Sequence, residues 1–173
     1  HHIDMHMKLL DEERVLVGEF PVGLSDGPQI ETNLNSYVAG HNSVFGGPFK
    51  LIRVPMPPST GGLYAPDASY RTYANNIFLN KLLLVPTYRE EYDTTGLRIL
   101  RESLPGYRVV GIDCDNSGSN IISLSGAIHC ISKGIGVADP LLIRHQALSD
   151  TYETVDPYAV EGYIRHRTGI SGA

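Results

Sequence analysis

The chain repeats one order of predicted elements, and this repeat constrains its fold more than any other feature of the sequence. Residues 1–54 are predicted to form a hairpin, a helix and a strand, and residues 75–112 show the same order again. A third copy is expected to begin near Asn120. A period of roughly 60–70 residues favours repeated α/β units around a common centre over a doubly wound sheet.

Each element of the first copy has its own signal. Apolar residues at 3–10 and 15–17 flank a polar turn, which is typical of two strands joined in a hairpin. Asp26 and Gln29 resemble a capping box, and apolar residues then follow at helical spacing. The apolar run at 49–54 is predicted to be a buried strand.

The second copy is bounded by similar signals. Residues 75–85 are predicted to form a tight hairpin that turns at Asn80. A helix is predicted to begin near Glu90, where acidic side chains favour the helix dipole, and to end at Pro105. Residues 107–112 are predicted to form the strand that completes this copy.

Polar residues occur near the start of the first strand in each copy. His2 and Asp4 occupy this place in the first copy, Asn75 in the second, and His129 and Cys130 in the third. If the copies are arranged around one axis, these strand ends converge. The repeat therefore predicts one shared site built from segments that are far apart in the chain.

The composition is that of a globular protein and argues against several classes of function. Of the 173 residues, 42% are hydrophobic and 19% are charged. A net charge of −5 without a Lys/Arg cluster argues against a nucleic-acid binder. No apolar run approaches the roughly 20 residues that span a bilayer. We therefore expect neither a nucleic-acid partner nor a membrane partner.

Cys130 lies in the segment Gly-Ala-Ile-His-Cys-Ile-Ser at 126–132, and three interpretations of it are open: core residue, metal ligand or nucleophile. The small-residue turn before it and the adjacent imidazole favour a functional thiol. A nucleophilic thiol needs a base. Because neighbouring residues in a strand point to opposite faces, His129 is not the expected base, which must come from elsewhere.

His2 and Asp4 are the candidate partners of the thiol. Two residues apart in a strand, they would share one face, and the carboxylate would tune the imidazole near neutral pH. One alternative is that His1 and His2 are the remainder of an affinity tag. Another is a metal-dependent hydrolase that uses His2, Asp4 and His6, since zinc sites combine such ligands with an open position for water.

Four segments together carry a resemblance to a known family. They are His-Ile-Asp at 2–4, Tyr-Ala-Asn-Asn-Ile-Phe-Leu-Asn at 73–80 with Val-Pro-Thr-Tyr at 85–88, Pro-Gly-Tyr-Arg-Val-Val-Gly-Ile-Asp at 105–113, and Gly-Ala-Ile-His-Cys-Ile at 126–131. In the same order, they resemble motifs of the Porphyromonas-type peptidylarginine deiminase and agmatine deiminase family. This resemblance lowers the weight of the tag alternative for His2.

The resemblance implies a fold and a chemistry. The fold would be the pentein fold, an α/β propeller with five-fold pseudo-symmetry, present here as a part truncated at both ends. The reaction would be hydrolysis of a guanidinium group to a ureido group and ammonia through a Cys thiouronium intermediate, without metal or organic cofactor. Cys130 would be the nucleophile, His2 the general acid and then base, Asp4 a ligand of the guanidinium nitrogens, and Asn75 part of the site lining.

The resemblance also suggests an organisation and a substrate class. Residues 1–148 would be the C-terminal part of a catalytic domain, and residues 149–173 a linker and the start of an accessory β domain. The Ser-Lys-Gly at 132–134 departs from the agmatine deiminases, which favours a peptidyl or free arginine side chain over agmatine as the substrate. A secreted or periplasmic location is favoured over a cytoplasmic one.

A second guanidinium-binding carboxylate is expected to lie outside this chain. We therefore expect the isolated 173-residue chain to be inactive or nearly so. A non-catalytic relative that serves as a binding module remains an alternative.

Overall fold

A computed structural model describes residues 2–115, 120–134, 142–145 and 162–165. The chain divides into two compact units, His1–Lys133 and Gly134–Ala173, which are described separately. Among the described residues, no helix has both the length and the apolar character that crossing a membrane requires.

The first sheet of the larger unit contains three strands in the order β1-β2-β3. These strands are β1 (Met7–Leu9), β2 (Arg14–Glu19) and β3 (Lys50–Pro55). β1 pairs with β2 antiparallel, and β3 pairs with β2 parallel. The connection from β2 to β3 contains α1 (Gly27–Asn33), which continues into the π-helical turn η2 (Leu34–Val38).

The second sheet has the same design, with the order β4-β5-β6. Its strands are β4 (Ile77–Leu79), β5 (Leu82–Thr87) and β6 (Arg108–Asp113), and α2 (Glu90–Ser103) connects β5 to β6. β4 pairs with β5 antiparallel and β6 pairs with β5 parallel. The predicted repeat of hairpin, helix and strand is therefore confirmed for the first two copies.

The two copies also match in register. The parallel pairs extend from Arg14↔Lys50 to Glu19↔Pro55 in the first sheet, and from Leu82↔Arg108 to Thr87↔Asp113 in the second. One further backbone hydrogen bond extends each ladder. Met56 N donates to Glu19 O over 2.8 Å, and Cys114 N donates to Thr87 O over 2.9 Å.

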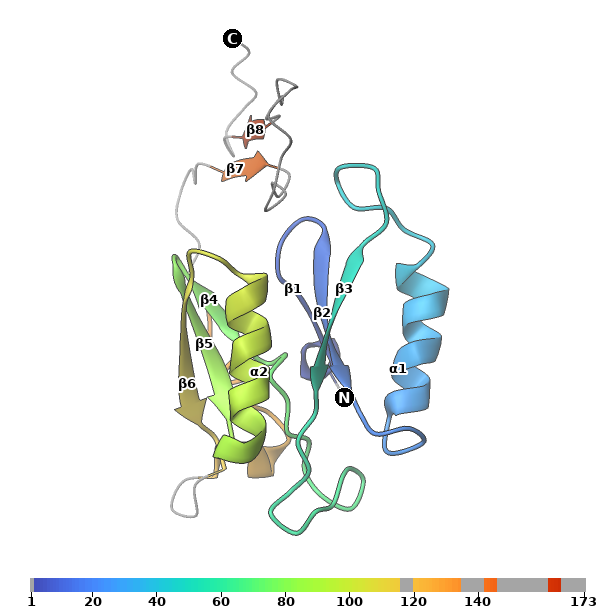
Figure 1. The fold of residues 1–173 in the computed structure, drawn as a ribbon, viewed down its shortest axis with the longest axis vertical. Helices are drawn as coiled ribbons and strands as arrows, with labels where there is room; N and C mark the ends of the chain where they lie inside the picture. Colours follow the sequence, from blue (N-terminus) through green and yellow to red (C-terminus); the bar gives the residue numbers. More distant parts are fainter. Residues whose placement is uncertain (1, 116–119, 135–141, 146–161, 166–173) are drawn as a thin grey trace. The chain divides into compact units, whose positions relative to one another are not determined.

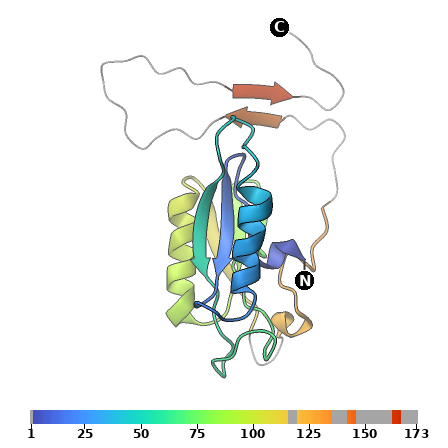
Figure 2. The same ribbon diagram turned by 90° about the vertical axis from the view of Figure 1, so that its right-hand side faces the viewer.

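The helices lie on different sides of the first sheet. α2 packs against β3 of the first sheet as well as β6 of its own, so it lies between the two sheets (Figure 1). α1 lies beyond the first sheet, and the view from the side shows the strands between the two helices (Figure 2). Leu100 of α2 and Leu104, the C-cap residue of this helix, are both buried, as their spacing predicts.

Close packing between α2 and the segment before β4 depends on a glycine. A Cβ atom at Gly96 would lie 2.6 Å from the ring of Tyr73. Without that atom, the Tyr73 ring packs against the helix backbone and is fully buried. The Tyr73 hydroxyl then donates a hydrogen bond to the Asp93 carboxylate over 2.9 Å.

Three local predictions are wrong. Residues Ile3–Met5 form a 3-10 helix, η1, where a strand was expected, and Ile121–Leu124 form another 3-10 helix, η3. Asp26 is the N-cap residue of α1, but its side chain makes no capping hydrogen bond. It accepts a hydrogen bond from the Tyr70 hydroxyl instead, because the loop that carries Tyr70 folds back over this helix end.

The smaller unit contains a two-stranded antiparallel sheet of β7 (Leu142–His145) and β8 (Gly162–Arg165). The strand predicted at 141–145 is thus present. Most of the predicted linker at 149–173 lies outside the described residues, as does His1.

Candidate active site

Three segments that are far apart in the chain meet at one place, as the repeat predicts. Asp4 comes from η1, and Asn75 comes from the fully buried stretch that precedes β4. Cys130 comes from a turn at 128–131. The Asn75 Nδ2 atom donates hydrogen bonds to Asp4 Oδ2 over 2.9 Å and to Cys130 Sγ over 3.1 Å.

Asn75 also holds the backbone of the cysteine turn. Its Oδ1 atom accepts hydrogen bonds from three backbone N–H groups: Ala127 at 3.1 Å, His129 at 3.0 Å and Cys130 at 3.3 Å. The Asn75 side chain has no exposed surface. A single buried amide therefore sets the conformation of the turn and the position of the thiol at the same time.

The residues before Cys130 allow the chain to turn tightly. Ser125 has a left-handed backbone with φ of 60°, which ends η3. A Cβ atom at Gly126 would lie 2.8 Å from the Cβ atom of Cys130, closer than real Cβ contacts allow. The glycine is therefore required for the thiol to fold back toward Asn75.

The Asp4 carboxylate is engaged on one oxygen only. Oδ2 lies 2.6 Å from His129 Nδ1 and 3.7 Å from Cys130 Sγ. Oδ1 is buried and has no hydrogen-bond partner in the described structure. Burial alone would raise the pKa of the Asp4 carboxyl, but the hydrogen bond and charge of His129, aided by Cys130 and the charge of His2, hold that pKa below its usual value.

The two histidines near the site differ from expectation in their contacts. The strand argument that set His129 apart is wrong, because residues 128–131 form a turn in which His129 and Cys130 both contact Asp4. His2 is exposed at the N-cap of η1, and its imidazole makes no hydrogen bond to any described residue. Its charge nevertheless contributes to the lowered pKa of Asp4, so His2 lies near that carboxylate.

His6 belongs to a different environment. Its ring makes an edge contact with Tyr70 at a centroid distance of 5.2 Å, and its Nε2 atom lies 3.7 Å from Asp26 Oδ2. Within the described residues, no three His, Cys, Asp or Glu side chains are grouped as a metal ion would require. The alternation predicted for His2, Asp4 and His6 is also lost, because Asp4 lies in a 3-10 helix.

The two cysteines have opposite environments. Cys114 is fully buried, and burial raises the pKa of its thiol to about 11. Cys130 is exposed and hydrogen-bonded. The first therefore has the environment of an inert core residue, and the second that of a thiol open to reagents.

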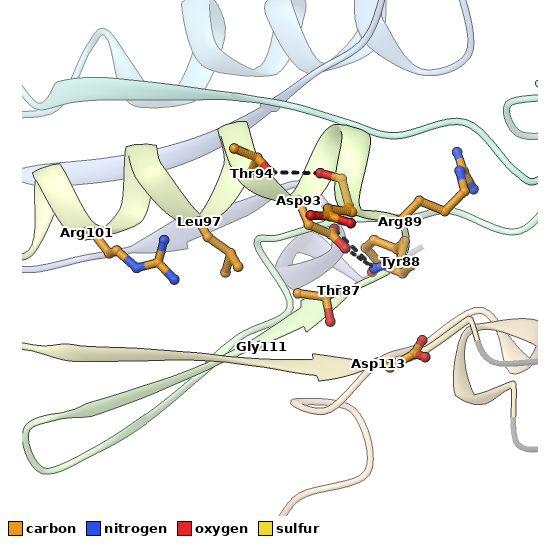
Figure 3. Close-up of a pocket in the computed structure, with 10 residues that line it drawn as sticks. Thr87, Tyr88, Arg89, Asp93, Thr94, Leu97, Arg101, Gly111 and Asp113 are labelled. Carbon is orange, nitrogen blue, oxygen red and sulfur yellow. Dashed lines mark hydrogen bonds between the residues drawn. The ribbon is translucent and has the colours of Figure 1, made fainter.

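A cavity of about 560 Å³ lies elsewhere, between α2 and the ends of β5 and β6 (Figure 3). Neither Asp4, Asn75 nor Cys130 lines it. Its lining mixes basic, acidic and neutral side chains, and it includes Thr87, Tyr88, Arg89, Glu90, Asp93, Thr94, Leu97, Arg101, Gly111 and Asp113. The candidate chemistry and this cavity are separate features of the molecule.

Several solved structures named as deiminases share the fold of this chain. A Porphyromonas gingivalis protein assigned as an arginine deiminase is 26% identical, with a TM-score of 0.60 over 75% of this chain and 36% of its own. The agmatine deiminase of C. jejuni is 24% identical, with a TM-score of 0.55 over 75% of this chain and 37% of its own.

The agmatine deiminase of Enterococcus faecalis shares the fold at 17% identity, with a TM-score of 0.57 over 75% of this chain and 39% of its own. The chain thus spans little more than a third of the length of these structures. A comparison with curated proteins finds no match.

A family model settles the membership that these likenesses indicate. The model for the Porphyromonas-type peptidyl-arginine deiminases matches residues 1–135, which include Asp4, Asn75 and Cys130. The relatives by fold are guanidino-group deiminases, hydrolases that act on C–N bonds. This chain belongs to the Porphyromonas-type peptidyl-arginine deiminase family.

Proposed function

We propose that the protein containing this chain hydrolyses a guanidinium group to a ureido group and ammonia, with Cys130 as the nucleophile. One observation carries the proposal. The exposed Cys130 thiol and the Asp4 carboxylate meet on the buried Asn75 amide, while Asp4 Oδ1 has no hydrogen-bond partner among the described residues.

Asp4 is suited to a guanidinium ligand. A guanidinium is planar and permanently charged, and a carboxylate accepts two of its N–H groups side by side. The unpartnered Oδ1 atom offers one acceptor, and the low pKa of the Asp4 carboxyl keeps the group ionised at neutral pH. The contact between His129 Nδ1 and Oδ2 competes with the substrate for the second acceptor.

Cys130 is placed for attack on the guanidinium carbon. The Asn75 side-chain N–H group donates a hydrogen bond to Sγ over 3.1 Å and so holds the sulfur beside Asp4. In the proposed reaction, the thiolate adds to the carbon, the C–N bond breaks, and ammonia leaves with a proton from His2. Water then attacks the thiouronium carbon, His2 accepts its proton, and the ureido product leaves with return of the thiolate.

The wider architecture and the substrate are part of the proposal. The two ββαβ units would be part of a pentein propeller, and a second guanidinium-binding carboxylate would come from the remainder of the protein. The departure at 132–134 favours a peptidyl or free arginine side chain over agmatine. Without the second carboxylate, the 173-residue chain alone is expected to release little or no ammonia.

The test measures ammonia release by the full-length protein from an arginine-containing peptide, from free arginine and from agmatine. We expect Cys130→Ala to lower kcat at least about 1,000-fold, as loss of a nucleophile does in other enzymes. Cys114→Ala is the matched control, and its activity should stay within about threefold of the parent protein, because the Cys114 thiol is buried and hydrogen-bonds to Ile112 O rather than to a site residue.

Three outcomes would contradict parts of the proposal. Full activity in Cys130→Ala would rule out the thiol mechanism. Loss of activity with a chelator would favour the metal-dependent alternative, and substrate binding without turnover would favour a binding module. His2→Ala and His129→Ala, compared in the same assay, would show which imidazole transfers the proton.

A further inference from the structure

We infer that Asp115 is a positioning residue that sets the place of Cys130 relative to Asn75, because its buried carboxylate ties together the two segments that carry them. The inference rests on the proposed function only in treating Cys130 as the reactive thiol. Asp115 directly follows Cys114 beyond the end of β6, and its side chain is 3% exposed.

One branch of the network runs from Asp115 to Arg71. The Arg71 guanidinium donates to both carboxylate oxygens, from Nε to Oδ2 over 2.7 Å and from Nη2 to Oδ1 over 2.8 Å. The Arg71 side chain is only 7% exposed, and its Nη1 atom donates to Ser69 O over 3.0 Å. This two-point contact fixes the orientation of the guanidinium as well as its distance.

The same branch continues from Arg71 along the chain to Asn75. The Tyr88 hydroxyl accepts a hydrogen bond from Thr72 N and donates one to Thr72 O, both over 2.8 Å. Ala74 N donates to Thr72 Oγ1 over 2.9 Å. All residues from 71 to 76 are buried. Because protein interiors are closely packed, a displacement of Arg71 is expected to displace Asn75 as well.

The other branch runs from Asp115 to the cysteine turn through Asn120. Asn120 Nδ2 donates to Asp115 Oδ1 over 3.3 Å, and Asn120 Oδ1 accepts a hydrogen bond from Ser123 N over 3.2 Å. Asn120 therefore caps η3, whose Ile122 is fully buried. The left-handed Ser125 follows η3 directly and leads into the turn that carries Cys130.

The Asp115 carboxylate has a second charged neighbour besides Arg71. A second arginine, Arg89, places its Nη1 atom 3.7 Å from Asp115 Oδ2, and its Nη2 atom donates to Pro58 O over 2.7 Å. Two guanidinium groups thus face one buried carboxylate. Asp115→Asn would leave the buried Arg71 guanidinium without its carboxylate partner, so this substitution is expected to destabilise the fold and is a poor test of positioning.

Two milder variants test each branch separately in the full-length protein. Asn120→Ala removes an exposed side chain that links Asp115 to η3, and Arg71→Lys keeps the charge but loses the two-point contact. The readout is the alkylation rate of Cys130 by iodoacetamide at pH 7, resolved from Cys114 by peptide mapping. The melting temperature is measured in parallel.

We expect each variant to slow alkylation of Cys130 about tenfold, because a displaced thiol loses its hydrogen bond from Asn75. The double variant should be slowed by clearly less than the product of the two single effects, since both act through Asp115. Arg53→Lys is the matched control. Arg53 also makes a two-point contact, with Glu31, but on an exposed surface. The alkylation rate of Cys130 in Arg53→Lys should therefore stay within about twofold of the rate in the parent protein.

A purely structural role predicts a different pattern. Lower melting temperatures with an unchanged alkylation rate in both variants would overturn the inference, and so would fully independent effects in the double variant. The readout needs no turnover. If alkylation responds as expected while the parent protein has no deiminase activity, the positioning role stands and the proposed function fails.

Discussion

The first and second copies of the repeat share strand order and register, but they hold their site residues in different ways. Phe20 directly follows β2, and its ring makes edge contacts with Tyr64 at 5.7 Å and His6 at 6.5 Å. Tyr88 directly follows β5, and its hydroxyl makes two hydrogen bonds to the backbone of Thr72. At this position the first copy has a phenyl ring that contacts other rings, whereas the second has a hydroxyl that hydrogen-bonds to the backbone.

The difference extends to the residues that each copy contributes to the site. Asp4 of the first copy keeps 18% of its side chain exposed and one buried oxygen without a partner. Asn75 of the second copy is fully buried, and its side chain makes hydrogen bonds with four residues of the site: Asp4, Ala127, His129 and Cys130. One topology thus supplies a partly exposed carboxylate in one copy and a buried scaffold in the other.

The largest expected effect is the difference in stability between substitutions at Asn75 and at Asp4. Asn75→Ala removes the acceptor of three backbone N–H groups, so we expect a loss of about 2–4 kcal/mol in the free energy of unfolding. Asp4→Asn should change that free energy by no more than about 1 kcal/mol, because Asp4 is partly exposed.

Both substitutions are expected to lower kcat/KM of the full-length protein at least about 100-fold. Urea unfolding and the ammonia assay measure the two quantities. Equal losses of stability in the two variants would show that Asp4 is as much a scaffold residue as Asn75.

The next effect compares a glycine in the helix of each copy. Gly96→Ala places a Cβ atom against the Tyr73 ring, and we expect it to destabilise the protein by about 1–3 kcal/mol. At Gly27 in α1, a Cβ atom would make an ordinary contact of 3.5 Å with Phe20, so Gly27→Ala should be neutral or stabilising by up to about 1 kcal/mol. Thermal and urea unfolding measure both. A neutral Gly96→Ala would mean that the second copy packs its helix no more tightly than the first.

The smallest expected effect is on the pH dependence of stability. Asp4 in the first copy and Asp93 in the second should contribute to it with opposite signs. The pKa of Asp4 lies below 3.8, so its stabilising contribution is present above pH 3.8 and is lost as the pH falls through the lowered value. Burial raises the pKa of Asp93 in α2 above 3.8. Its stabilising contribution is therefore present below pH 3.8 and is lost as the pH rises through the raised pKa.

Unfolding free energies measured between pH 2 and pH 6, at about one-unit steps, test these signs. Asp4→Asn should flatten the fall in stability toward acid, and Asp93→Asn should steepen the rise in stability with pH. If the two substitutions changed the slope of stability against pH in the same direction, the assignment would be contradicted.

Much of the fold could be predicted because local signals and the repeat agree. The hairpin turns at Asn80, which adopts a φ of 55° that asparagine tolerates well, and α2 ends before Pro105 as expected. The meeting of Asp4, Asn75 and Cys130 also followed from the repeat. The wrong strand predictions fall on short segments at 3–5 and 121–131, where no periodicity develops and apolar runs resemble strands. The capping box at Asp26 failed for another reason, because Asp26 accepts a hydrogen bond from the distant Tyr70 hydroxyl.

The sequence by itself determined the order and boundaries of the two ββαβ copies, the family and the candidate nucleophile, because these depend on patterns within short stretches of chain. Only the tertiary structure decided which groups surround Cys130. It brought His129 rather than His2 into contact with Asp4, and it buried Asp115 between Arg71 and Asn120. The contacts of Asp4 with His129 and of Asp115 with Arg71 join residues dozens of positions apart, and which of them form depends on packing that no local pattern encodes.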